Sequence, residues 1–300
     1  MHNLQLQGVS PQQLANMAAG LAEAGDTEMS ARLYRLALKS VSGEARRRLQ
    51  MRLGIVEAGK KMTQPMRHIL RELEQNALDV FVGHGLATWN KTLPFFEDDR
   101  FVELADKHSH LLPMTNWHWN LQTVLWAVQR AKQLDGEFME LGVFKGHTTL
   151  FCADYVGFAD WPKRWYLYDT FEGIPDEQVD PGWEDVSRRV YTGLFSFEEV
   201  RDRFSPFPNI EVIKGRVPDV LAQTCPDKIA FLHMDLNSST AEVQALDAVY
   251  DRLVSGAMVV FDDYGWSVAR AQHDAENAWF AQRGERILPL PTGQGLFIKT

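Results

Sequence analysis

The feature that most constrains the fold of this chain is a series of short apolar runs in its second half, each followed at once by a glycine or an acidic residue. Four of these endings carry motifs: Glu140-Leu-Gly-Val-Phe-Lys-Gly146, Tyr168-Asp-Thr-Phe-Glu-Gly-Ile-Pro175, Leu232-His-Met-Asp235 and Phe261-Asp-Asp-Tyr-Gly265. Each run is short enough to be a buried strand, and helical patterns lie between the runs. Strands that alternate with helices predict an α/β fold, a doubly wound, Rossmann-like parallel sheet that binds ligands at the carboxyl ends of its strands.

The boundaries of these elements follow from the residues around them. Strands are expected over residues 137–141, 165–169, 210–213, 229–235 and 257–262. A helix that Asn116 can cap should precede the first strand and end near Gln133. Further on, Pro291-Thr-Gly-Gln-Gly295 separates two short apolar runs, which predicts an antiparallel hairpin at the carboxyl end of the sheet.

A long insertion, residues 176–208, separates the second expected strand from the third. Within it, Ser196 and Glu199 form the capping-box pattern that starts a helix. Because the insertion follows the carboxyl end of a strand, it is a candidate wall for a substrate pocket.

The first part of the chain has helical periodicity. Residues 10–40 predict a helical hairpin that resembles one tetratricopeptide unit, and residues 43–60 can add a helix. One such unit cannot bury its own faces, so we expect a helical appendage that packs on the main domain or on a second subunit. We also expect a homo-oligomer. The expected division is an appendage over 1–62, a linker and lid over 63–115, and the main domain over 116–300.

Composition excludes several classes of protein. A hydrophobic content of 45% can fill a sizeable core, and a net charge of −9 argues against a nucleic-acid partner. No apolar run approaches the length that spans a bilayer, so no membrane partner is expected. The two cysteines, Cys152 and Cys225, form no C-x-x-C pair, so we expect reduced thiols and a cytoplasmic protein.

The glycine turn after the first strand indicates the kind of cofactor. A dinucleotide fingerprint needs G-x-G-x-x-G, but Phe144 and His147 occupy its second and third glycine positions. NAD and FAD are therefore disfavoured, whereas Glu140, Gly142 and Gly146 suit a cofactor with no phosphate over the turn. Such a turn alone is weak evidence, because many strand-to-helix connections need a glycine for close packing.

Two sets of acids follow the other strands. Asp169 ends the second strand, where an acid can bind ribose hydroxyls; a helix N-cap is the alternative. Asp235, Asp262 and Asp263 end two strands expected to be neighbours. Three converging carboxylates match Mg²⁺ or Mn²⁺, and a solvated Asp-Asp turn is the alternative.

Together the four motifs resemble those of class I S-adenosylmethionine-dependent methyltransferases, and more specifically the macrocin O-methyltransferase family. The motifs occur in family order, and the resemblance covers roughly residues 113–299. It implies a metal-dependent enzyme that transfers a methyl group to a hydroxyl of a sugar or glycosylated small molecule in natural-product biosynthesis. A catechol-type phenolic O-methyltransferase and a non-catalytic cofactor-binding scaffold are the alternatives.

The resemblance also implies roles for particular residues. Asp235, Asp262 and Asp263 would hold the metal, and Asp235 would take part in catalysis. The residues implied at the cofactor are Met114, Thr115, Glu140, Gly142, Val143, Gly146, Thr148, Asp169, Thr170, Phe171 and Asp235.

One position departs from the family. Sugar methyltransferases of this kind often carry a second aspartate, two residues after the first metal ligand, that is proposed as the general base. Here that residue is Asn237, whose amide cannot take a proton near neutral pH. Either the metal alone lowers the pKa of the hydroxyl, or another group acts as base. Asn237 and His147 are the catalytic candidates besides Asp235, and His233 and His273 are further candidate bases.

Overall fold

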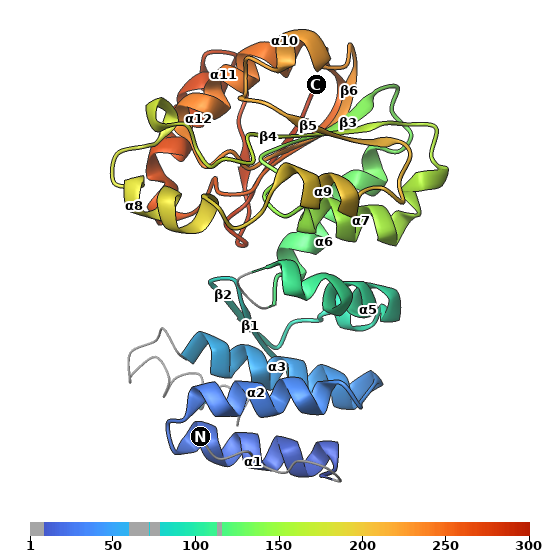
Figure 1. The fold of residues 1–300 in the computed structure, drawn as a ribbon, viewed down its shortest axis with the longest axis vertical. Coiled ribbons are helices and arrows are strands. Elements are labelled where there is room, and N and C mark those ends of the chain that lie inside the picture. The colour runs from blue at the N-terminus through green and yellow to red at the C-terminus, as the bar shows by residue number, and fades with distance from the viewer. Residues whose placement is uncertain (1–8, 60–71, 73–78, 113–115) are drawn as a thin grey trace. The chain divides into compact units, whose positions relative to one another are not determined.

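The computed structural model describes residues 9–59, 72, 79–112 and 116–300. Its contacts divide the chain into two compact units (Figure 1). Unit 1 comprises Met1–Glu103 and Pro113–His118, and unit 2 comprises Leu104–Leu112 and Trp119–Thr300. The three-part division expected from the sequence stays a prediction.

Unit 2 is built on a seven-stranded sheet of order β5-β4-β3-β6-β7-β9-β8. Neighbouring strands from β5 to β7 are parallel, and β9 lies antiparallel to both β7 and β8. This confirms the predicted doubly wound sheet with its antiparallel hairpin. The strands are β3 Glu137–Leu141, β4 Trp165–Asp169, β5 Ile210–Lys214, β6 Ile229–Met234, β7 Leu253–Phe261, β8 Leu288–Pro289 and β9 Gly295–Ile298.

Helices cover both faces of this sheet. Figure 1 shows α6, α7 and α9 on one side, and α10, α11 and α12 on the other. All six residues of β6 are buried, as a central parallel strand requires, and their neighbours in the core include Met139, Leu246 and Phe280. The helices are α6 His118–Ala131, α7 His147–Val156, α9 Phe197–Arg203, α10 Leu221–Thr224, α11 Ser239–Val249 and α12 Arg270–Ala281, with short turns η2 Ser109–Leu111, η3 Phe158–Asp160, η6 Tyr250–Arg252 and η7 Ser267–Ala269.

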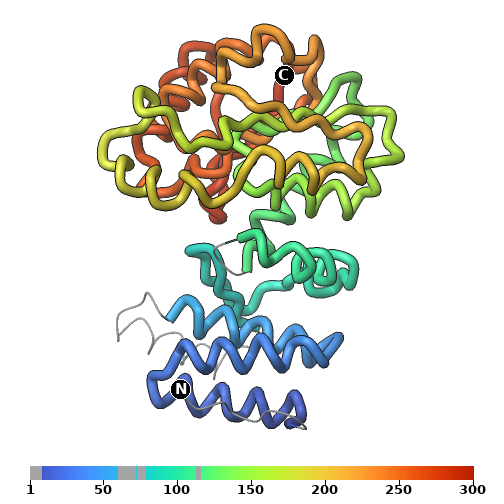
Figure 2. The backbone as a smooth tube through the Cα atoms, in the orientation of Figure 1, coloured from blue at the N-terminus to red at the C-terminus, as the bar shows by residue number. Residues whose placement is uncertain are grey.

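The insertion forms a long connection between β4 and β5 (Figure 2). It contains η4 Asp176–Gln178, α8 Glu184–Val186, the π-helical turn η5 Ser187–Tyr191, and α9. The predicted capping box is confirmed, because Ser196 Oγ accepts from Glu199 N and the Glu199 carboxylate accepts from Ser196 N.

Unit 1 begins with α1 Pro11–Glu23, α2 Thr27–Leu38 and α3 Gly43–Gly59, which confirms the expected helical hairpin and third helix. The first two helices have side-chain N-caps, at Ser10 and Asp26. Ala18, Ala31 and Leu33 are fully buried between these helices, which share a core of their own.

A hairpin that the sequence analysis did not predict follows in unit 1. It consists of β1 Val80–Gly83 and β2 Leu86–Trp89, and η1 Pro94–Phe96 and α5 Asp99–His108 come after it. The predicted cap of α6 is wrong: the helix begins at His118, and the Asn116 side chain instead donates from Nδ2 to Val82 O at 2.9 Å.

His118 is buried among aromatic side chains. Its ring centroid lies 5.1–5.9 Å from those of Phe81, Phe95, Phe96 and Phe101. Within the described residues, neither ring nitrogen has a hydrogen-bond partner. Burial therefore lowers the pKa of His118 to about 4.

No helix in the described part of the chain has the length and apolarity needed to cross a membrane.

Candidate active site

The sheet brings the four motifs to one edge. β3 lies between β4 and β6, and β6 pairs with β7, so the residues after these four parallel strands share the carboxyl edge. The strand order reverses between β3 and β6, which makes this the topological switch point where doubly wound sheets bind ligands.

The glycine turn touches the strand that carries the first acid. Gly142 has a φ of 84°, and a Cβ atom there would lie 1.9 Å from the carbonyl oxygen of Asp235. The two segments are also joined by a hydrogen bond from Asp235 N to Leu141 O, at 2.8 Å. Gly142 is therefore required for close packing as well as for the turn. Gly146, at the start of α7, has a φ of 75° and packs under Phe204.

Asp169 is held by the backbone of the two turns beside it. Its Oδ2 accepts from Val143 N and Phe144 N at 2.8 and 2.9 Å, and its Oδ1 accepts from Phe171 N at 2.7 Å. These bonds do not fully offset burial, which raises the pKa of Asp169. A carboxylate has about four lone-pair positions. Three of them accept from backbone N–H groups here, and the contact of Asp169 with ribose hydroxyls stays a prediction.

Phe144 and Phe171 both have positive φ values, of 50° and 56°. Bulky residues rarely adopt this conformation, and the bonds to Asp169 stabilise it. Phe195 lies edge-on to both rings, with centroid distances of 4.7 and 6.2 Å. Aromatic side chains of the insertion therefore cover the glycine turn.

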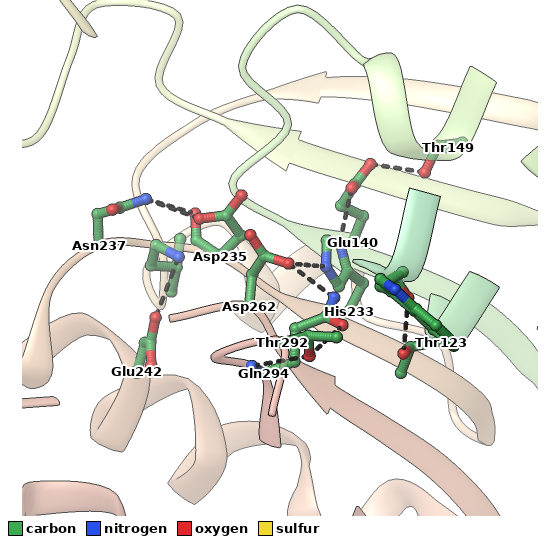
Figure 3. A network of polar contacts seen from close by, with 12 residues as sticks. Thr123, Glu140, Thr149, His233, Asp235, Asn237, Glu242, Asp262, Thr292 and Gln294 are labelled. Carbon is green, nitrogen blue, oxygen red and sulfur yellow. Dashed lines mark hydrogen bonds and ion pairs between the residues drawn. The ribbon is translucent and has the colours of Figure 1, made fainter. Parts of the chain in front are cut away.

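The Glu140 carboxylate contacts two side chains of unit 2. Its Oε2 accepts from Thr149 Oγ1 at 2.6 Å, and its Oε1 lies 2.8 Å from His233 Nδ1 (Figure 3). Glu140 is 2% exposed, so its predicted contact with a cofactor would have to be shared with these partners.

His233 lies between two carboxylates. Its Nε2 is 3.6 Å from Asp262 Oδ1, on the side opposite Glu140. Burial alone would lower the pKa of His233, but Asp262 and Glu140 outweigh it and raise the pKa well above 6.5. The ring is thus held between two acids, and a base role for His233 stays a prediction.

The three predicted metal ligands come together after β6 and β7. Asp262 is buried, and Asp235 and Asp263 are partly buried. Burial, and after it the neighbouring acids, raises the pKa values of Asp235 and Asp263 well above 3.8. Nevertheless, within the described residues no group of three or more His, Cys, Asp or Glu side chains is arranged to hold a metal ion as it stands.

Two amides hold these acids. Asn237 Nδ2 donates to Asp235 Oδ1 at 2.7 Å, and Gln294 Nε2 donates to Asp262 Oδ1 at 2.9 Å (Figure 3). Gln294 is fully buried and comes from the turn before β9. The sequence analysis identified this turn but gave Gln294 no role.

Tyr191 also reaches this group from the insertion. Its hydroxyl donates to Asn237 Oδ1 at 3.1 Å. Burial, and after it Asp235, Asp263 and Asp262, raises the pKa of Tyr191 above its usual value, so the phenol is neutral. The sequence offered no signal for Tyr191, because the two residues are 46 positions apart.

The other two candidate histidines have different surroundings. Burial, with His108 and His110 nearby, lowers the pKa of His147 to about 3, which makes it a weak base near neutral pH. His273 Nδ1 lies 2.9 Å from the carbonyl oxygen of Tyr264. A base role for His147 stays a prediction.

The remaining predicted cofactor residues have local roles or lie elsewhere. Thr170 Oγ1 donates to Gly173 O at 2.6 Å and shapes the turn after β4, and Thr148 is the second residue of α7. Met114 and Thr115 lie outside the described residues.

Comparison with known proteins finds similar O-methyltransferases by both family and sequence. The family model of the macrocin-O-methyltransferases (TylF) matches residues 113–282. An 8-demethyl-8-(2,3-dimethoxy-alpha-L-rhamnosyl)-tetracenomycin-C 4'-O-methyltransferase of Streptomyces olivaceus is 26% identical over 171 residues, which cover 54% of this chain and 64% of that protein. A demethyldecarbamoylnovobiocin O-methyltransferase of Streptomyces niveus is 28% identical over 138 residues, 43% of this chain and 53% of that protein.

The chain thus spans less than two thirds of the length of these two relatives. Among solved structures, the O-methyltransferase NovP matches with a TM-score of 0.52 and 20% identity, over 60% of this chain and 79% of that one, which supports the fold. The family match covers more than half of the chain and includes the glycine turn, Asp169 and the three acids after β6 and β7. The chain belongs to the macrocin-O-methyltransferase family.

Proposed function

We propose that this protein is an S-adenosylmethionine-dependent O-methyltransferase that acts on a hydroxyl of a sugar or glycosylated small molecule, with a divalent cation at its three acids. The observation that carries the proposal is the position of Asp235, Asp262 and Asp263 beside the Gly142 turn, at the switch point of the sheet. Both curated relatives are O-methyltransferases of natural products, and one is named for a rhamnosyl compound.

The chemistry of the donor set fits a hard cation such as Mg²⁺ or Mn²⁺. Burial, and after it the neighbouring acids, raises the pKa values of Asp235 and Asp263, and a bound cation would offset both effects. Oxygen ligands of this type suit these ions, and when bound such an ion would lower the pKa of an acceptor hydroxyl. Since the three acids together are not arranged as a ready site, the side chain of at least one of them would have to turn for binding.

The donor, S-adenosylmethionine, would supply a methyl group on a sulfonium, which is already a good leaving group. The protein's task is then to position and dehydrate the reactants. Asp169 would accept from the ribose, and the rings of Phe144, Phe171 and Phe195 would limit the access of water to the turn. Asn237 and Tyr191 place neutral polar groups beside Asp235, where an acceptor hydroxyl would lie.

The cofactor assignment is tested by thermal unfolding with S-adenosylhomocysteine and with NAD. We expect only the former to raise the melting temperature, because a ligand that binds the folded state stabilises it by mass action. A shift with NAD alone would contradict the assignment.

The reaction is tested by methyl transfer to rhamnosides and catechols, with Mg²⁺ and with excess chelator. We expect turnover with rhamnosides that chelation abolishes. Asp262→Asn should lose far more activity than affinity for S-adenosylhomocysteine. The matched control is Asp227→Asn, at an exposed position before the amino end of β6. Transfer only to catechols would favour the phenolic alternative. Full activity in excess chelator would contradict the proposed divalent cation.

A further inference from the structure

A chain of hydrogen bonds leads from the insertion to the acids. The Tyr191 hydroxyl donates to Asn237 Oδ1 at 3.1 Å, and Asn237 Nδ2 donates to Asp235 Oδ1 at 2.7 Å. Figure 3 shows the second of these contacts, with Asn237 pointing at the Asp235 carboxylate. Asn237 is 8% exposed, so its amide is held between these two groups rather than in solvent.

An amide is the side chain that this position requires. Its oxygen accepts from a phenol, and its nitrogen donates to a carboxylate. An ionised aspartate at position 237 could accept from Tyr191, but it would turn lone pairs toward Asp235 at hydrogen-bond distance. The structure therefore accounts for asparagine where related enzymes often carry a second aspartate.

The residues after Asn237 bind the same insertion. Ser238 Oγ donates to Gln178 O at 2.5 Å. Ser239 donates to the Asp180 carboxylate from its backbone N and from Oγ, at 2.9 and 2.5 Å. Three consecutive residues, at the end of the loop after β6 and the start of α11, thus fix the insertion, and the contact between Tyr191 and Asn237 is part of this set.

Packing also fixes the Tyr191 ring. Phe144, in the glycine turn, lies edge-on to it with a centroid distance of 5.9 Å. The hydroxyl is therefore directed at Asn237 by the turn on one side and by the insertion backbone on the other.

We propose that Tyr191 is a positioning residue for the acid cluster: acting through Asn237, it holds Asp235 in the orientation that binds a divalent cation. The inference rests on the proposed cation site. A neutral donor on one oxygen of Asp235 orients the carboxylate and leaves its charge intact. Outer hydrogen-bond partners of this kind raise metal affinity by orienting the ligand.

The test is the binding of Mn²⁺ to the full chain, followed by the loss of the six-line electron paramagnetic resonance signal of the free ion. Tyr191→Phe removes the hydroxyl and keeps the ring, and we expect it to raise the Kd for Mn²⁺ about three- to tenfold. Asn237→Gly removes the amide, and glycine tolerates the φ of 54° at this position. We expect this variant to raise the Kd by about tenfold or more.

The decisive variant combines both changes. If Tyr191 acts through Asn237, the double variant should bind Mn²⁺ no more weakly than Asn237→Gly alone, since the first change then removes nothing further. The control is Tyr250→Phe. Tyr250 lies before the amino end of β7, about 30 Å of strand away from the acids. Like Tyr191→Phe, the Tyr250→Phe variant loses a hydroxyl that donates a hydrogen bond, in this case to the Glu285 carboxylate. It should bind Mn²⁺ as the wild type does.

Each other outcome is informative. A wild-type protein that binds no Mn²⁺ overturns both this inference and the proposed cation site. Normal binding by Tyr191→Phe overturns only the inference, as do additive effects in the double variant. Melting temperatures of all variants show whether a change in affinity follows from unfolding.

Discussion

At the residue scale, Gly142 has the least room for an added Cβ atom among the glycines that the structure describes. A Cβ atom at this position would meet the backbone of Asp235, which has no flexible end that can move away. The residue therefore packs the turn after β3 directly against the segment that follows β6.

We expect Gly142→Ala to destabilise the protein by more than about 3 kcal/mol, because the clash adds to the cost of a positive φ. The matched control is Gly157→Ala, where φ is 65° and nothing lies within 4 Å of the new Cβ. This variant should lose only about 1–2 kcal/mol. Urea unfolding of both variants measures the difference, and equal losses would show that the contact with Asp235 is unimportant.

The buried ring of His118 should make the stability of the protein depend on pH. Its pKa is about 4 in the folded protein and about 6.5 in the unfolded chain. A lowered folded pKa gives stability that is complete above the unfolded value and is lost as the pH falls from about 6.5 to 4. The loss should reach about 3 kcal/mol.

His118→Phe should remove this part of the pH dependence and leave stability at pH 7 equal or higher, because it replaces two unpaired nitrogens inside an aromatic cage. His110→Gln, at an exposed position, is the control. Urea midpoints between pH 4 and 8 give the comparison, and an unchanged slope in His118→Phe would contradict the prediction.

Among the helices, α11 and α12 meet through two buried acids. Glu242 on α11 is 1% exposed and Glu276 on α12 is fully buried. Burial, and after it Glu242, raises the pKa of Glu276 well above 4.5. Glu242 also accepts from Leu236 N, in the loop that leads to Asn237, and from Gln272.

The raised pKa means that the folded protein prefers Glu276 protonated. The stability that this provides is present below about pH 4.5 and is lost as the pH rises through the folded pKa. We expect Glu276→Gln, which keeps the neutral shape, to raise the urea midpoint at pH 8 by the equivalent of about 1 kcal/mol. Glu211→Gln, at an exposed side chain of β5, should leave the midpoint unchanged. A lower midpoint for Glu276→Gln would show that the charge is needed.

Elements with continuous apolar patterns were predictable from the sequence, and short ones were not. The six buried residues of β6 leave a clear pattern, as do α1 and α2 with their caps. The hairpin of β1 and β2 has only four residues in each strand, too few for a periodicity to develop.

The candidate site divides in the same way. The acids and glycines at strand ends follow from the order of strands, so their proximity could be predicted. The binding of Asp169 by backbone N–H groups depends on positive φ values at Phe144 and Phe171, which phenylalanine does not suggest. The Tyr191 contact depends on how the insertion folds, which no local pattern encodes.

The whole molecule contains separate cores. The α1–α3 helices share one core, and the seven-stranded sheet and its helices share another. We therefore expect two calorimetric transitions, of which S-adenosylhomocysteine raises only the one belonging to unit 2. At a ligand concentration 100 times the Kd, the stabilisation is about 2.7 kcal/mol. A single transition that moves as a whole would show that the units unfold together.

The contacts that Asn237, Ser238 and Ser239 make with the insertion also determine which segments can change in length. Deleting one residue between β6 and α11 would shift all the contacts with Gln178, Asp180 and Tyr191 out of register together. The segment 181–190 lies between these anchor points and carries none of the three. Segments of other lengths could therefore be grafted between Asp180 and Tyr191, which would vary the insertion while the acids keep their positions.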